Sequence, residues 1–172
     1  FTAVENTGSG SSWAGIDTLD GGLTDQVLSM AIGDLDDDGN LDFAVGNDFS
    51  NSESLGVYEH DGNIFNGLPG PEILGSDTEG NDRQYTALVF GDLDNDGRLD
   101  LATCGGSTDR LVIFRNDGTP FNDPWSSRVI GSPNDCAQLA LADFDNDGYL
   151  DIVVSENDGS SLFRVYRNDV PV

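Results

Sequence analysis

The sequence contains no lysine, and its seven basic residues, all arginines, face 32 acidic residues. The formal net charge at pH 7 is therefore −25. Because so acidic a surface repels polyanions, we expect neither nucleic acid nor an anionic membrane surface as a partner. Long hydrophobic runs are also missing, so we expect no insertion into a membrane.

An initiator methionine and a signal peptide are absent from the sequence, which begins at Phe1. We therefore expect either a processed chain or an excerpt from a longer protein. The length of 172 residues suits one ordinary domain. Glycine, by contrast, is abundant, and the chain has many short apolar runs separated by Gly, Asn, Asp and Ser.

One acidic segment occurs three times, at residues 33–46, 91–105 and 142–156, each time between two apolar runs. The loops within these segments span residues 34–42, 92–100 and 143–151. Aspartate recurs at loop positions 1, 3, 5 and 9, and glycine at position 6 permits a sharp turn with positive φ. The aspartates are Asp34, Asp36, Asp38 and Asp42; Asp92, Asp94, Asp96 and Asp100; and Asp143, Asp145, Asp147 and Asp151.

Four carboxylates held this close together require a cation. Ca²⁺ accepts six to eight oxygen ligands with loose angular demands, whereas Mg²⁺ requires a stricter octahedron and keeps its waters. Position 7 varies between Asn40, Arg98 and Tyr149, so we expect it to contribute only its backbone carbonyl. We predict three Ca²⁺ sites, and the alternative is a solvated acidic turn without an ion.

The loops differ from an EF-hand, which closes with a bidentate glutamate at position 12 between two helices. Here position 12 is Val45, Thr103 or Val154, and an apolar strand follows. The pattern D-x-D-x-D-G-x-x-D between strands resembles the FG-GAP/VCBS repeat of integrin α-subunit propellers and many bacterial surface proteins. The resemblance implies four-stranded β-propeller blades, each with Ca²⁺ in the loop joining its first two strands. The third copy departs from it by beginning with Ala142 instead of glycine.

A second apolar element, ending in an Asn or His turn, recurs with the same period of about 55 residues as the loops. With the elements between them, the repeats predict about thirteen short strands and no helix. We therefore interpret residues 1–172 as a single all-β domain of the β-propeller type, with blades of four antiparallel strands. The domain holds about three blade equivalents, which cannot close a ring.

Both terminal blades are expected to be incomplete. Trp13 to Leu19 reads as a fourth strand without a first or second, and the last blade ends after its third strand, at residues 163–169. Because exposed strand edges pair readily, we expect a partner chain, or the missing remainder of a longer protein, to complete the blades. If residues 1–172 are the complete chain, self-association into rings or filaments is expected.

Two cysteines, Cys104 and Cys136, fall at the end of a second strand and just before the next first strand. In a blade of alternating strands these points lie at the same face, opposite the acidic loops. A disulfide between them is therefore predicted, and two buried free thiols are the alternative.

Catalytic residues are scarce. The only histidine, His60, fills a slot that asparagine occupies in the other repeats, so we interpret it as a turn residue. Carboxylate pairs for glycoside hydrolysis are conceivable in so acidic a chain, but the best-clustered aspartates are assigned to metal. We expect no enzyme activity. Four aromatic residues, Trp13, Trp125, Phe65 and Phe121, either stack on sugars or pack blade against blade.

These observations predict a calcium-stabilised β-propeller module for adhesion, scaffolding or self-assembly. Because weak calcium sites fill at the millimolar concentrations found outside cells, we expect a secreted, extracellular or cell-surface location. Two alternatives are a calcium-dependent lectin that binds carbohydrate between blades and a non-catalytic appendage of a larger secreted enzyme.

Overall fold

The computed structural model describes residues 2–3, 17–18, 26–49, 55–62, 70, 72–74, 83–105, 109–122, 125–157, 159 and 163–169. These residues form thirteen β-strands, and none of them lies in a helix. No helix that could cross a membrane is found in this part of the chain. The predicted all-β class is therefore confirmed.

Most strands belong to three successive blades, in which neighbouring strands are antiparallel. The first blade consists of β3 (Val27–Gly33), β4 (Asp42–Phe49), β5 (Leu55–Tyr58) and β6 (Glu72–Ile73). The second consists of β7 (Arg83–Gly91), β8 (Asp100–Gly105), β9 (Arg110–Arg115) and β10 (Ser126–Gly131). The third consists of β11 (Cys136–Ala142), β12 (Asp151–Glu156) and β13 (Phe163–Tyr166).

The terminal blades are incomplete within the described residues, as expected. The third blade has no described fourth strand beside β13. At the other end, β1 (Thr2–Ala3) and β2 (Asp17–Thr18) form a separate antiparallel pair. This pair corresponds to the last two strands of a blade that has no described first or second strand.

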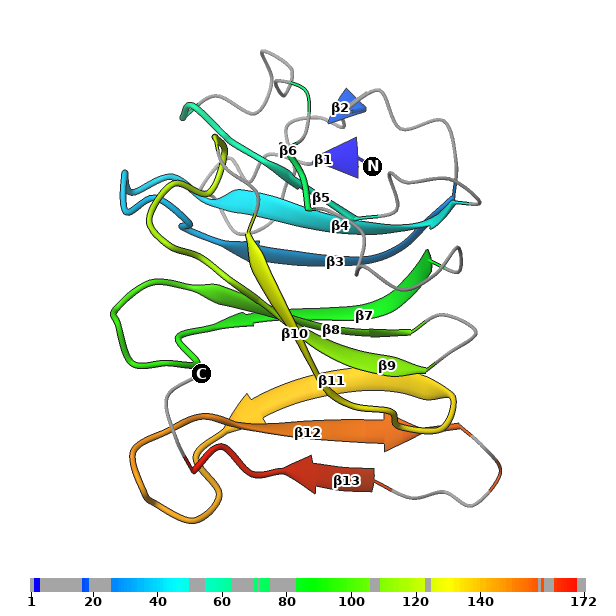
Figure 1. The fold of residues 1–172 in the computed structure, drawn as a ribbon. Helices are drawn as coiled ribbons and strands as arrows, with labels where there is room; N and C mark the ends of the chain where they lie inside the picture. Colours follow the sequence, from blue (N-terminus) through cyan, green and yellow to red (C-terminus); the bar gives the residue numbers. More distant parts are fainter. Residues whose placement is uncertain are drawn as a thin grey trace, which may run out of the picture.

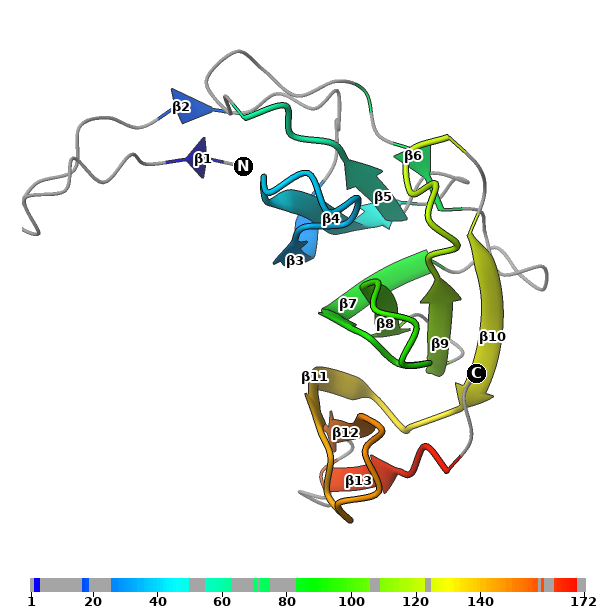
Figure 2. The ribbon, with the colours of Figure 1, turned by 90° about the vertical axis from the view of Figure 1, so that its left-hand side faces the viewer.

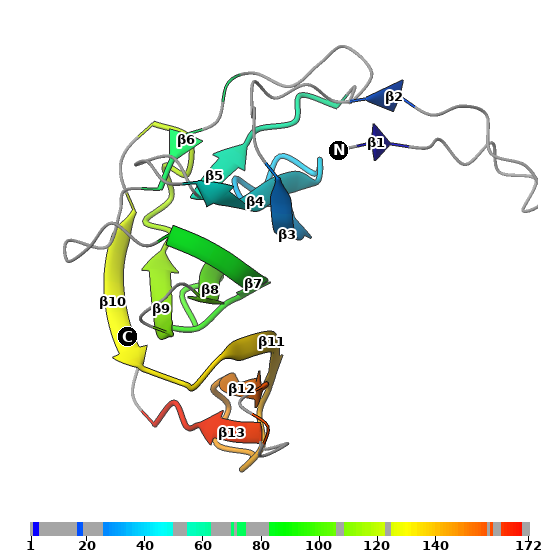
Figure 3. The same cartoon turned by 90° about the vertical axis from the view of Figure 1, so that its right-hand side faces the viewer.

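The three blades are arranged as a fan about an open centre (Figures 2 and 3). The first strands β3, β7 and β11 line the inner side, and β6 and β10 lie toward the outside. A short backbone ladder between the end of β4 and the start of β7 also joins the first two blades, where Asp48 pairs with Gln84. The arrangement agrees with propeller blades of which the described chain supplies only part of a ring.

Apolar side chains fill the spaces between neighbouring blades. The core between the first and second blades includes Leu55, Val57, Leu101, Phe114 and Trp125. A similar core between the second and third blades is built from their β-branched and leucine side chains, such as Ile113, Ile152 and Val154. Since each fully buried side chain of this size contributes about 1.5 to 3 kcal/mol, the packing between blades contributes substantially to stability.

The structure decides between sugar stacking and packing of blade against blade for Trp125. Its side chain is only 7% exposed, and its indole N–H donates a hydrogen bond of 3.0 Å to the Pro120 carbonyl. Phe121 packs against the same core. Both residues therefore pack blade against blade. Trp13 and Phe65 lie outside the described residues, so for them both alternatives, sugar stacking and packing of blade against blade, stay open.

The glycine that precedes the first aspartate of a loop allows the next blade to approach. A Cβ atom on Gly33 would lie 2.6 Å from Leu99 Cδ1, and one on Gly91 would lie 2.3 Å from Leu141 Cδ1. Both leucines belong to the following blade. No further blade follows Ala142 in the described chain, so this contact does not constrain the third copy. The departure from glycine there has a packing explanation.

The predicted disulfide between Cys104 and Cys136 is present, with the two Cα atoms 6.1 Å apart. It joins the end of β8 to the start of β11 and so links the second blade to the third. Both ends lie opposite the acidic loops, because β8 begins at one loop and β11 leads into the next. Thr86 supports the same junction, since its hydroxyl donates to the Cys136 carbonyl at 3.0 Å.

Candidate metal centres

Each acidic loop connects the first and second strands of its blade. The loops follow β3, β7 and β11 and lie at the same edge of the molecule, on the left in Figure 1. Their backbones share one conformation. Glycine at position 6 has a φ of 90° at Gly39, 90° at Gly97 and 94° at Gly148, as the sharp turn requires.

Position 4 of each loop also has a positive φ, which the sequence analysis did not anticipate. The values are 59° at Asp37, 57° at Asn95 and 61° at Asn146. Asp and Asn are the residues other than glycine that most readily adopt this left-handed conformation. Their recurrence at position 4 was the available signal.

The aspartates at loop positions 1, 3 and 5 are held in place by the loop's own backbone. In all three loops the position 6 glycine N–H donates to an oxygen of the first aspartate at 3.0 Å. The aspartate at position 5 accepts a hydrogen bond from the N–H of position 7, at 2.7 Å in the first loop and 2.9 Å in the others. These bonds curl the loop so that its carboxylates face inward.

The aspartate at loop position 9 is buried and anchors each loop. Asp42, Asp100 and Asp151 are each about 1% exposed. One carboxylate oxygen accepts the N–H of loop position 2, and the other accepts an N–H just after the third strand. The donors are Leu35 and His60 for Asp42, Leu93 and Asn116 for Asp100, and Phe144 and Asn168 for Asp151, at distances of 2.8 to 3.1 Å.

Burial has an electrostatic cost at this position. It raises the pKa of Asp100 from 3.8 to about 6, although the two backbone N–H groups partly offset the effect. Burial also raises the pKa of Asp42, with the same kind of opposing hydrogen bonds. The nearby carboxylates at positions 3 and 5 raise both pKa values further. A bound cation would remove this penalty.

The pH dependence of stability is therefore expected to change sign with calcium. Without metal, Asp100 is protonated in the folded chain but ionised in the unfolded chain between about pH 4 and 6, because its pKa is raised only in the folded state. Proton binding therefore favours the folded state, so lowering the pH from 7 to 5 raises the melting temperature. With excess calcium, the same acid protonates ligands that must be ionised and lowers it. Melting curves of metal-depleted and calcium-loaded protein at both pH values test this. Equal signs in the two conditions would contradict it.

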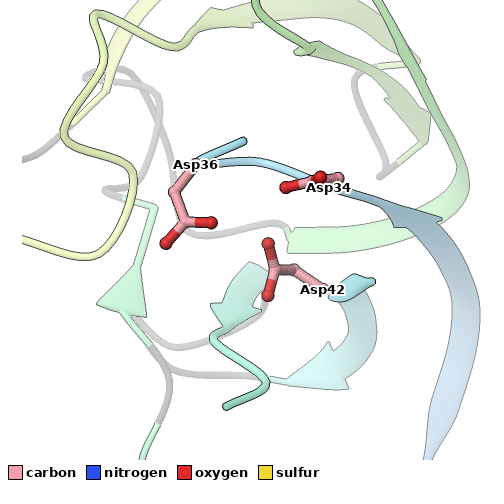
Figure 4. Close-up of side chains that lie close together, drawn as sticks. All are labelled: Asp34, Asp36 and Asp42. Atoms are coloured by element: carbon pink, nitrogen blue, oxygen red, sulfur yellow. The ribbon is translucent and has the colours of Figure 1, made fainter. Parts of the chain in front are cut away.

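Carboxylate oxygens converge in every loop, with sets of three lying within 4.8 Å of one another. Figure 4 shows this for the first loop, where the three side chains point toward one another. The sets are Asp34, Asp36 and Asp42; Asp92, Asp94 and Asp96; and Asp143, Asp145 and Asp151. Asp147 forms a further exposed set with Asp145 and Asp169, and Asp169 was not among the predicted ligands.

Two predicted ligands, Asp38 and Asp100, lie outside these converging sets. Arg98 turns its side chain toward Asp96 and the Asn116 carbonyl, which leaves only its backbone as a ligand. The carbonyls of Asn40, Arg98 and Tyr149 stay predicted ligands.

The residues present fit a hard divalent cation. All donors are carboxylate oxygens, which Ca²⁺ prefers. In addition, Asp34 Oδ1 is buried and has no hydrogen-bond partner within the described residues. An unpartnered buried carboxylate oxygen is costly, and a cation at the centre of the first set would satisfy it.

Hydrogen bonds connect neighbouring loops across the blades. The Asn116 side chain donates to the Leu35 carbonyl of the first loop at 2.9 Å, while its backbone N–H binds Asp100. Asn168 repeats this one blade later, donating to the Leu93 carbonyl at 2.7 Å and binding Asp151 through its backbone. The sequence pattern predicts only turn residues at these asparagines. They join each loop to the next blade.

Replacing Asn116 tests this connection. In Asn116→Ala the buried Leu35 carbonyl loses its partner, and we expect a loss of about 1 to 3 kcal/mol in the free energy of unfolding. Denaturant unfolding of Asn116→Ala and of the exposed Asn122→Ala provides the comparison. Equal stability of the two variants would show that the bond between the blades contributes nothing.

His60 holds the equivalent position in the first blade. Its backbone N–H donates to Asp42, and its ring lies edge-on to Phe43 with centroids 6.4 Å apart. Both ring nitrogens are buried and lack a hydrogen-bond partner in the described structure. This placement agrees with a turn residue beside the first loop.

The repeated loops and blades match a known family. A family model described as the FG-GAP-like repeat matches residues 34–103 and again residues 92–154. Together the matches cover more than half of the chain. The chain belongs to the FG-GAP-like repeat family. In this FG-GAP protein each match runs from the first aspartate of one loop to the second strand of the next blade. Among curated proteins, none matches the chain.

Proposed function

We propose that this FG-GAP protein is a calcium-stabilised, non-catalytic propeller module that acts outside the cell in adhesion, scaffolding or assembly. The observation that carries the proposal is the convergence of three carboxylates in each of the three loops, always including the aspartates at positions 1 and 3. Each loop has the same glycine turn at position 6, the same hydrogen bond from that glycine to the first aspartate, and a buried aspartate at position 9. Such repeated geometry is expected of a functional cation site.

A calcium role explains why so many carboxylates converge in a chain with no lysine. Sites of this kind in extracellular modules bind Ca²⁺ with dissociation constants of about 0.1 to 1 mM. They fill outside the cell and stay empty in the cytosol. The disulfide and the family support the same location, since disulfides persist in oxidising compartments.

Metal stoichiometry tests the proposal directly. Equilibrium dialysis followed by elemental analysis should find three Ca²⁺ per chain at millimolar calcium. Magnesium at the same concentration should displace little of it, because Mg²⁺ keeps its waters. The variant Asp143→Ala should lose one ion, whereas Asp117→Ala, at an exposed turn, should lose none. Fewer than one ion per wild-type chain would overturn the proposal.

Assembly is the partner role that the fold supports best. The outer edge of β13 has no described neighbour, and Phe163 and Val165 on this strand are 73% and 44% exposed. A strand from another copy or another protein would cover them and complete the sheet. Light scattering after size exclusion should show association that increases with concentration. A calcium-loaded monomer at every concentration would argue against self-assembly.

A further inference from the structure

Arginine side chains lie on the carboxylates of two loops. In the second loop, Arg115 Nε is 2.5 Å from Asp94 Oδ2, and Arg98 forms an ion pair with Asp96 Oδ2. In the third loop, Arg167 Nε is 2.6 Å from Asp145 Oδ2. No arginine contacts the four aspartates of the first loop in the described part of the chain.

The difference between the loops comes from one position in the repeat. Arg115 and Arg167 directly follow Phe114 and Tyr166, which pair with the residues after Asp100 and Asp151. The same register in the first blade pairs Tyr58 with Phe43, so Glu59 occupies this position. An acidic residue thus stands beside the first loop where the other two have a basic one.

The remaining loop residues increase this contrast. Counting each nine-residue loop with this flanking position, the first site has six acidic residues and no basic one, because position 4 is Asp37. The second site has four acidic residues and two arginines. The third has four acidic residues and one arginine, since its position 7 is Tyr149. The affinity of such loops for Ca²⁺ depends on their ligand charge.

The arginines reduce the charge without closing the cage. Asp94 uses Oδ1 to accept the Asp96 N–H and presents Oδ2 to Arg115. The Asp94 side chain is 3% exposed and that of Arg115 is 45% exposed, so the carboxylate is shielded from water while its arginine partner stays partly solvated. In the first loop the buried Asp34 Oδ1 has no such compensation.

From these contacts we infer that the three sites differ in calcium affinity, in the order first, third, second, and that the second loop keeps its shape without calcium because Arg98 and Arg115 offset half of its negative charge. The inference rests on the proposed calcium function. It assigns Glu59 and Arg115 as the residues that set the difference. The first blade is then the part of the chain whose order responds to the lowest calcium concentrations.

Nuclear magnetic resonance can follow each site separately. The amides of Gly39, Gly97 and Gly148 each donate to the first aspartate of their own loop and report its occupancy. Calcium titration of ¹⁵N-labelled protein should give the lowest midpoint at Gly39 and the highest at Gly97. Exchanging the charges should reverse this order: Glu59→Arg raises the Gly39 midpoint about tenfold, and Arg115→Glu lowers the Gly97 midpoint about tenfold.

Controls separate local charge from net charge. Arg110→Glu makes the same change in net charge as Arg115→Glu, but at the far end of β9, and should leave all three midpoints within about twofold, since interactions beyond a Debye length of about 10 Å are largely screened. The milder Arg115→Gln should lower the Gly97 midpoint by a smaller factor and preserves the fold. Three equal midpoints, or shifts as large in Arg110→Glu, would overturn the ranking while calcium binding stands. If no glycine amide responds to calcium, the proposed function itself fails.

Discussion

Removing calcium with EDTA at pH 7 is expected to lower the melting temperature of this protein by about 15 to 30 °C. At free calcium a hundredfold above the dissociation constant, each site adds about 2.7 kcal/mol, so three sites add about 8 kcal/mol. This is comparable with the whole net stability of a typical domain. The reason lies in the fold, because every blade has a loop whose carboxylates repel one another without a cation.

Differential scanning calorimetry with calcium, with EDTA, and with EDTA followed by excess calcium measures this effect. Excess calcium should restore the original transition, and the same excess of magnesium should restore little of it. An unchanged melting temperature in EDTA would remove structural calcium from the account of this fold. It would leave the contacts between blades, the hydrogen bonds of the loops and the disulfide as the sources of stability.

The second large effect is expected from Asp100→Ala. This change removes a predicted ligand and also leaves the N–H groups of Leu93 and Asn116 buried without an acceptor. Each unsatisfied group costs about 1 to 3 kcal/mol. With the lost calcium site, we expect a total loss of about 5 to 8 kcal/mol in calcium buffer. Much of the loss should persist in EDTA, since the hydrogen bonds do not depend on the metal.

Asp94→Ala is the matched comparison, because Asp94 faces the same cage but accepts only the Asp96 N–H within its own loop. It should be destabilising in calcium, and in EDTA it should lose only about 1 kcal/mol, because its ion pair with the exposed Arg115 is removed. Chemical unfolding of both variants under both conditions separates the two roles. If Asp100→Ala and Asp94→Ala lose the same free energy of unfolding in EDTA, the aspartate at position 9 is only a ligand and not an anchor.

The repeat itself made most of the fold predictable. Loop spacing and the apolar runs around it located the blade strands, because alternation of strands and turns is a local property of the sequence. The Cys104–Cys136 bond was also accessible, since strand direction alone places both residues at one face. For Trp125, sequence offered two roles, and only packing against the neighbouring blade decided between them.

What sequence could not supply is the set of long-range contacts, both between blades and between strands of one blade. The hydrogen bond from Asn116 to Leu35 spans 81 residues, and nothing in either residue type announces it. The aspartate at position 9 is both a predicted ligand and a hydrogen-bond acceptor. Sequence could not show the second role for the same reason, because one of its donors follows a different strand. The ion pair between Arg115 and Asp94 likewise depends on the register of β8 and β9.

The disulfide has a mechanical consequence for a protein of this kind. Cys104 and Cys136 are 32 residues apart in sequence, so the covalent bond encloses β9 and β10. When the chain is pulled from its two ends, tension passes through the sulfur atoms and bypasses this segment. Its maximum extension is shorter by roughly 100 Å than that of the reduced chain, at about 3.3 to 3.6 Å per residue. The outer half of the second blade is thus shielded from force for as long as the bond is intact.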